Sequence, residues 1–122
     1  MSNQAVFDAA WLHIMKQGQA SFSRGTCQYR HSDTIGCAFA PCIARYHKSM
    51  EGGNAEHLIR EFPDRLHVWA LDCDLELAYA VQLAHDRNSG YPTSLFLERF
   101  ESAMREIAGN AGLTIPEKGA VT

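Results

Sequence analysis

The chain lacks the features that mark several large classes of protein. No segment approaches the roughly 18 consecutive apolar residues of a membrane span. The N-terminus has no basic region followed by an uninterrupted apolar one, because Asp8, His13 and Lys16 break it up, so we expect no signal peptide and a cytoplasmic protein. The 11 basic residues are scattered among 14 acidic ones, for a net charge of −3, which disfavours a nucleic-acid surface.

Signatures of catalysis are also missing from the sequence. There is no glycine-rich phosphate loop, no G-x-S-x-G elbow and no H-E-x-x-H motif. A DNA-mimicking inhibitor would need a dense acidic face, and the only tight acidic group is Asp72, Asp74 and Glu76. Internal repeats, linkers and low-complexity tracts are absent as well. The residues by themselves therefore assign no enzyme class.

What the chain does contain is the composition of one soluble globular domain. Its 122 residues, 46% of them hydrophobic, are enough to bury a core without disulfide bonds or metals. We predict a single domain over residues 1–116 and a flexible tail over 117–122. Apolar periodicity and stop signals predict about four helices: Asn3 to Gln17, Asn54 to near Pro63, Leu75 to about Arg87, and Pro92 to Gly112.

Two of these segments need comment. The helix from Leu75 to Arg87 is apolar nearly all round, so we expect it to be central and buried on most sides. Residues 66–71 are ambiguous, because Val68 and Trp69 suit a strand whereas Leu66, Trp69 and Ala70 suit a helix.

Residues 26–43 read as a small antiparallel β-hairpin. Cys27 and Tyr29 alternate with polar neighbours, which is the period-two pattern of a half-buried strand. A loop centred on Ser32 would place Cys27 opposite Cys37. The predicted fold class is therefore α+β, mainly α, with this one hairpin among about four helices.

The cysteines raise the possibility of metal or thiol chemistry. Cys27, Cys37 and Cys42, with His47 nearby, follow the spacing Cys-x9-Cys-x4-Cys-x4-His, which lacks the close ligand pairs of a structural zinc site. Buried thiols that pack as small hydrophobes explain the pattern as well, so we expect no cofactor. A small metal- or thiol-dependent enzyme at these residues is the alternative.

His85 and Asp86 close the predicted central helix. A histidine at that position can interact with the unpaired carbonyl groups of the helix C-terminus, which is a structural role. The functional alternative is an acid/base pair or a contact with a partner.

The tip of the predicted hairpin offers a partner-binding surface. It carries Tyr29, Arg30, His31 and Asp33, and Tyr and Arg are enriched at binding hot spots. An ordinary hairpin in which Arg30 pairs with a nearby acid would look the same.

Several short motifs, weak singly, form a set that covers most of the chain. They are Cys27-x-Tyr29-Arg30, Cys37-Ala38-Phe39-x-x-Cys42-Ile43, Tyr46 with Met50-Glu51-Gly52, and Gln82-x-x-His85-Asp86. The set resembles a group of small bacteriophage and prophage proteins without an assigned activity. Their pattern has Gly where this chain has Ala40, so the second predicted strand is expected to bend differently here.

This resemblance implies a mobile-element protein expressed in a bacterial cytoplasm. Our hypothesis is a non-enzymatic accessory protein that binds a host protein or complex and modulates or inhibits it. A host defence complex of the CRISPR type is one such target, by analogy with other small phage proteins. The sequence leaves the oligomeric state open.

Overall fold

The structure of the protein, a computed structural model, describes residues 2–23, 26–27, 36–51 and 55–116. Five α-helices account for most of this part of the chain. They are α1 (Ser2–Gln17), α2 (Ala55–Glu61), α3 (Val68–Leu71), α4 (Leu75–Asp86) and α5 (Thr93–Ala111). Three single turns of 3-10 helix, η1 (Ala40–Cys42), η2 (Lys48–Met50) and η3 (Pro63–Arg65), lie in the connections, and β1 (Phe22–Ser23) pairs with β2 (Thr26–Cys27).

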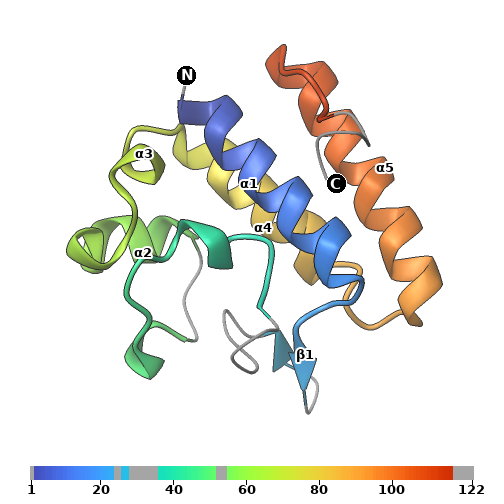
Figure 1. The fold of residues 1–122 in the computed structure, drawn as a ribbon, viewed down its shortest axis with the longest axis horizontal. Helices are drawn as coiled ribbons and strands as arrows, with labels where there is room; N and C mark the ends of the chain where they lie inside the picture. Colours follow the sequence, from blue (N-terminus) through green and yellow to red (C-terminus); the bar gives the residue numbers. More distant parts are fainter. Residues whose placement is uncertain (1, 24–25, 28–35, 52–54, 117–122) are drawn as a thin grey trace.

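Three of the helices form the main body of the molecule. Helices α1, α4 and α5 lie side by side, and α5 runs back along α4 after a short connection (Figure 1). Helix α2 packs against α4 and α3 packs against α1, on the side away from α5. The β1–β2 pair lies beyond the C-terminal end of α1.

The apolar side chains of these elements form two adjoining clusters. The first fills the space between α1, α4 and α5 and includes the fully buried rings of Phe7, Phe96 and Phe100. The second lies under η1, η2 and α2 and includes Phe39 and Met50. Helix α1 contributes to both clusters, so it ties the two halves of the core together.

The predicted hairpin over residues 26–43 is wrong, and with it the α+β class, because the described chain is mainly helical. After Gly36 the chain makes a turn and then η1, with Cys37 and Phe39 buried. Strand pairing between β1 and β2 extends over only two residues each. Pro41 lies at the start of η1, where its fixed φ suits a helical turn and its missing N–H would interrupt a ladder.

Three further predictions concern residues 66–71, the burial of α4 and the tail over residues 117–122. Residues 66–71 divide between the alternatives, since Leu66 forms an isolated bridge with Ile43 and Val68–Leu71 is helical. Helix α4 was expected to be buried on most sides, but it is buried along one side, and Leu75 and Tyr79 are exposed. The predicted tail, residues 117–122, lies outside the described residues.

Two helices end at glycines. Gly18 follows α1 with φ +77°, and Gly112 follows α5 with φ +68°. Residues with a Cβ rarely adopt such angles, so these positions favour glycine for conformational reasons.

Gly112 and Gly109 make a matched pair for testing this end of α5. A Cβ at either position would meet no atom within 4 Å, so the substitutions differ only in backbone conformation. We expect Gly112→Ala to lower the free energy of unfolding by about 1 kcal/mol. Gly109→Ala, inside the helix, should raise it by about 0.5–1 kcal/mol. Urea unfolding measures both, and equal effects of the same sign would contradict the assignment.

Candidate partner-binding site

The four residues predicted to contact a partner, Tyr29, Arg30, His31 and Asp33, lie outside the described residues. The structure does describe how the chain is held on both sides of them. These attachments involve the C-terminal end of α1 and the C-terminal end of α4.

The chain that follows residues 28–35 is held at Gly36 by the side chain of Gln17. The N–H of Gly36 donates to Gln17 Oε1 at 2.8 Å, and Gln17 Nε2 donates to the Gly36 carbonyl at 2.9 Å. His13 Nε2 lies 3.1 Å from the same carbonyl oxygen, and since a carbonyl only accepts, the Nε2–H of His13 is the donor. Both backbone groups of Gly36, which is buried, are therefore paired.

The chain that precedes β1 is held by His85. The backbone N–H of Ser21 donates to His85 Nε2 at 2.8 Å, so this nitrogen carries no proton. The proton is then on Nδ1, which lies 2.8 Å from Asp86 Oδ1 and donates to it. The imidazole is fully buried and packs edge-on against Phe96, with ring centroids 5.5 Å apart.

These contacts are those of a structural histidine. An acid/base role would require a ring nitrogen that faces a substrate, and Nε2 is occupied by a backbone N–H. Ser21, His85 and Asp86 have the residue types of a hydrolase triad, but it is the amide of Ser21 that meets the ring. Among the described residues, the buried Ser21 hydroxyl has no hydrogen-bond partner.

The cysteines that the structure describes are poorly suited to nucleophilic chemistry. Burial raises the pKa of the Cys37 thiol well above its usual value, and the negative charge of Asp86 raises it further. Burial, followed by the neighbouring Cys73, raises the pKa of Cys42. The thiolate is the reactive form, so these side chains behave as packed thiols.

The alternative metal site, Cys27, Cys37, Cys42 and His47, is described only in part. His47 is exposed, and its Nδ1 accepts from the N–H of Ser49 at 3.1 Å, which caps η2. Cys27 lies in β2, and its side chain is outside the described part of the structure. Among the described residues, no group of three or more His, Cys, Asp or Glu side chains could hold a metal ion.

Comparison of the chain with protein-family models, with curated proteins and with solved structures finds no match. None of the helices in the described ranges is both long and apolar enough to span a membrane.

Sequence reasoning did not find Gln17, His13 or Ser21 as anchoring residues. Gln17 is the last residue of α1, directly before the Gly18 stop, and nothing in its neighbourhood indicates a partner 19 positions away. His85 was singled out, but its partner Ser21 is 64 residues distant. Such pairings arise from the tertiary fold and leave no local pattern.

The anchoring role of His85 can be tested with His85→Phe. Phe keeps the ring against Phe96 but leaves the buried Ser21 N–H without an acceptor, which costs about 1–3 kcal/mol. We expect the free energy of unfolding to fall by that amount. The matched control is His67→Phe, since His67 is half-buried and its ring stacks on that of Trp69, with the ring centroids 5.2 Å apart. It should change stability by less than about 0.5 kcal/mol. Equal effects of the two substitutions would contradict the role.

His13 should make stability depend on pH. Burial lowers its pKa below the usual 6.5, the hydrogen bond to Gly36 partly opposes this, and His85 lowers it slightly further. The unfolded chain therefore binds the proton more readily than the folded protein. This stability is present above about pH 6.5 and is lost as the pH falls through 6.5 towards the lowered pKa of the folded state.

The corresponding measurement is urea unfolding at about pH 7.5 and 5.5, for the unsubstituted protein and for His13→Gln. Glutamine can still donate to the Gly36 carbonyl but does not titrate. We expect the loss of stability on acidification to be smaller in the variant. An identical loss in both proteins would show that His13 does not contribute.

Proposed function

We propose that the protein is a non-enzymatic accessory protein of the phage type, which binds a host protein or protein complex in the bacterial cytoplasm and modulates or inhibits it. The observation that carries the proposal is that the reactive candidates in the described part are used inside the core. His85 has both ring nitrogens in hydrogen bonds, and Cys37 and Cys42 are buried with raised pKa values. What remains for function is the surface.

The attachments described above support a binding role for residues 28–35. Binding residues work best on a loop whose ends are fixed by a rigid scaffold. Here Ser21 is fixed to α4 by His85, and Gly36 is fixed to α1 by Gln17. Tyr29, Arg30, His31 and Asp33 lie in the sequence between these two points, so we assign the partner contact to them.

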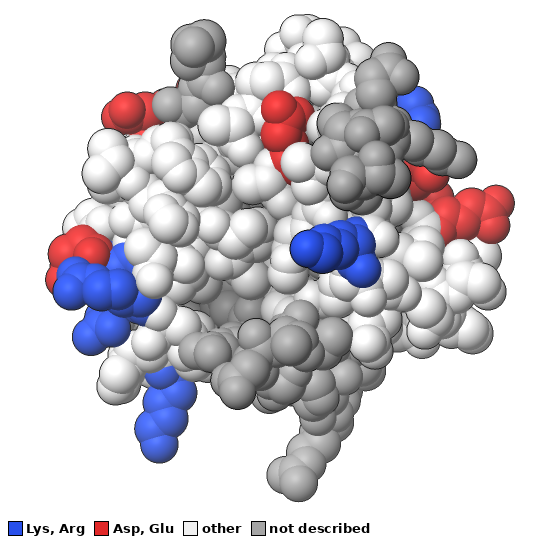
Figure 2. All heavy atoms as spheres, in the orientation of Figure 1, with Lys and Arg blue, Asp and Glu red and all other residues white. Residues whose placement is uncertain are grey.

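The partner is more plausibly a protein than a nucleic acid. Figure 2 shows Lys and Arg side chains scattered over one face, with acidic side chains among them and no continuous basic patch over the coloured and white residues. Binding to phosphate backbones depends on clustered basic side chains. A host defence complex, such as a CRISPR effector, is the kind of target we propose. The alternative of a thiol- or metal-dependent enzyme gains no support from the described cysteines.

Affinity purification from a bacterial host lysate, with mass spectrometry of the recovered proteins, tests the proposal. We expect Tyr29→Ala/Arg30→Ala to reduce recovery of a specific partner at least tenfold, which corresponds to about 1.4 kcal/mol, the loss of a single hot spot. The chain supplies a matched control in Tyr91 and Arg99, an exposed pair with the guanidinium carbon 4.3 Å from the ring centroid.

Tyr91→Ala/Arg99→Ala should leave recovery unchanged. Both double variants must keep the circular dichroism and melting temperature of the unsubstituted protein. Failure to recover any specific partner, or equal losses in the two variants, would count against the proposal.

A further inference from the structure

Helix α4 exposes an apolar stripe on its outer side. Leu75 and Tyr79 are 36% and 44% exposed, and Leu83, four residues further on, is half-buried. Residues at four-residue spacing follow one another along a helix face. A soluble helix normally turns such a stripe inward, so its exposure indicates a contact surface.

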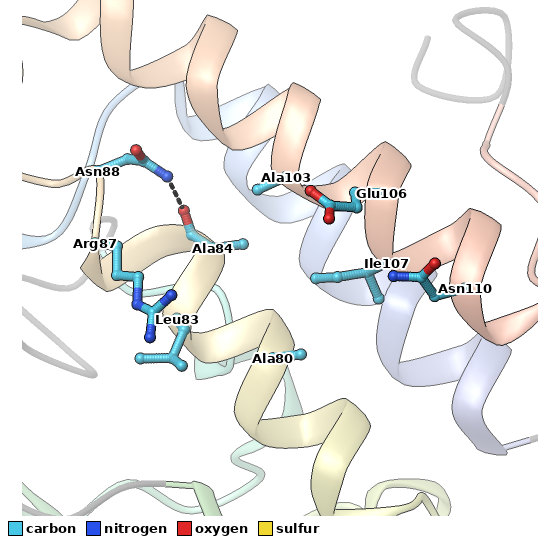
Figure 3. A pocket seen from close by; sticks show the side chains of 9 residues that line it. All are labelled: Ala80, Leu83, Ala84, Arg87, Asn88, Ala103, Glu106, Ile107 and Asn110. Carbon is cyan, nitrogen blue, oxygen red and sulfur yellow. Dashed lines mark hydrogen bonds between the residues drawn. The ribbon is translucent and has the colours of Figure 1, made fainter.

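Beside this stripe lies an open groove of about 320 Å³ between α4 and α5 (Figure 3). Its floor contains three small side chains, Ala80, Ala84 and Ala103, with the half-buried Leu83 and Ile107 along its length. Polar side chains complete the lining: Arg87, Asn88, Glu106 and Asn110. Small residues on a helix allow a second helix to approach closely.

We propose that this surface binds a second copy of the chain, with the two α4 helices packed antiparallel around a two-fold axis. When the axis passes level with the peptide between Val81 and Gln82, two of the three large side chains of the stripe are level with an alanine of the second copy. Leu83 is then level with the half-buried Ala80 of the second copy, Tyr79 is level with its Ala84, which is mostly buried, and Leu75 is level with its Asn88. This is the self-complementarity that an interface between identical subunits requires.

The charges at the two ends of α4 favour the same arrangement. Glu76 is in the first turn and Arg87 is the C-cap residue, and both are exposed. They are eleven residues apart, about three turns, so they lie on the same side of the helix. The proposed two-fold axis places Glu76 of each copy opposite Arg87 of the other, giving two ion pairs. A parallel arrangement would bring like charges together.

Neither Glu76 nor Arg87 forms an ion pair with another described residue. Within the ranges that the structure describes, the ion pairs are Arg45–Asp64, Arg60–Glu56, His85–Asp86 and Arg105–Glu101, and none involves Glu76 or Arg87. The proposal is independent of the host-binding function, because it uses the outer side of α4 and not residues 28–35.

Charge reversal tests the proposal, with molecular mass measured by sedimentation equilibrium over micromolar protein concentrations. The unsubstituted protein should be a concentration-dependent dimer. Either Glu76→Arg or Arg87→Glu alone places like charges opposite each other at both of the symmetry-related contacts between positions 76 and 87. Each should raise the dissociation constant of the dimer at least tenfold. The control Glu98→Arg, an exposed position on α5 outside the groove lining, should have no effect.

Mixing the two single variants is the decisive step. In the mixed dimer, one copy carries two acids at positions 76 and 87 and the other carries two arginines, so both pairs become attractive again. The 1:1 mixture and the double variant Glu76→Arg/Arg87→Glu should both recover the dimer. A monomeric unsubstituted protein, a dimer indifferent to the single reversals, or a mixture that stays monomeric would each overturn the proposal. Circular dichroism confirms that the variants are folded.

Discussion

Two hydrogen bonds between the Gln17 carboxamide and the backbone of Gly36 fix the chain directly after residues 28–35, to which the proposed function is assigned. The chain that continues from Gly36 is buried from Cys37 to Phe39, and η1, which follows it, contacts α1. Other amide side chains act in the same way. Asn3 pairs with both the backbone and the carboxylate of Asp74, and Gln4 pairs with the N–H and carbonyl of Thr114. Helix α1 is thus an axis to which distant segments are attached.

The helices could be predicted from the sequence because their signals are local. Apolar spacing and glycines such as Gly18 and Gly112 define where α1 and α5 end, and the structure has the same ends. The hairpin prediction failed because a short alternation at Cys27 and Tyr29 was extended through Pro41, where the chain instead makes a helical turn. The attachments of Gly36 and Ser21 had no local signal at all.

The surface proposed for self-association follows from side chains of α4 that do not pack inside the described core. The all-round apolar character of α4 was visible in the sequence but was interpreted as burial, and the exposed Leu75 and Tyr79 show that part of it faces outward. In contrast, the side chains of His85 and Cys37, which the sequence offered as candidates for acid/base and thiol chemistry, are buried in the core. These two candidates for chemistry are therefore part of the core, and the function proposed above rests on binding at the surface.

Amide hydrogen exchange at Ser21 and Gly36, measured by NMR, tests this account most directly. Neither amide belongs to a helix, so protection must come from His85 and Gln17. The account predicts exchange slowed by at least a hundredfold relative to an unfolded chain, on the order expected of structure that opens rarely. It also predicts that Gln17→Leu removes the protection of Gly36 while leaving the centre of α5 protected. Exchange of both amides at unfolded-chain rates, or protection of Gly36 that survives Gln17→Leu, would contradict it.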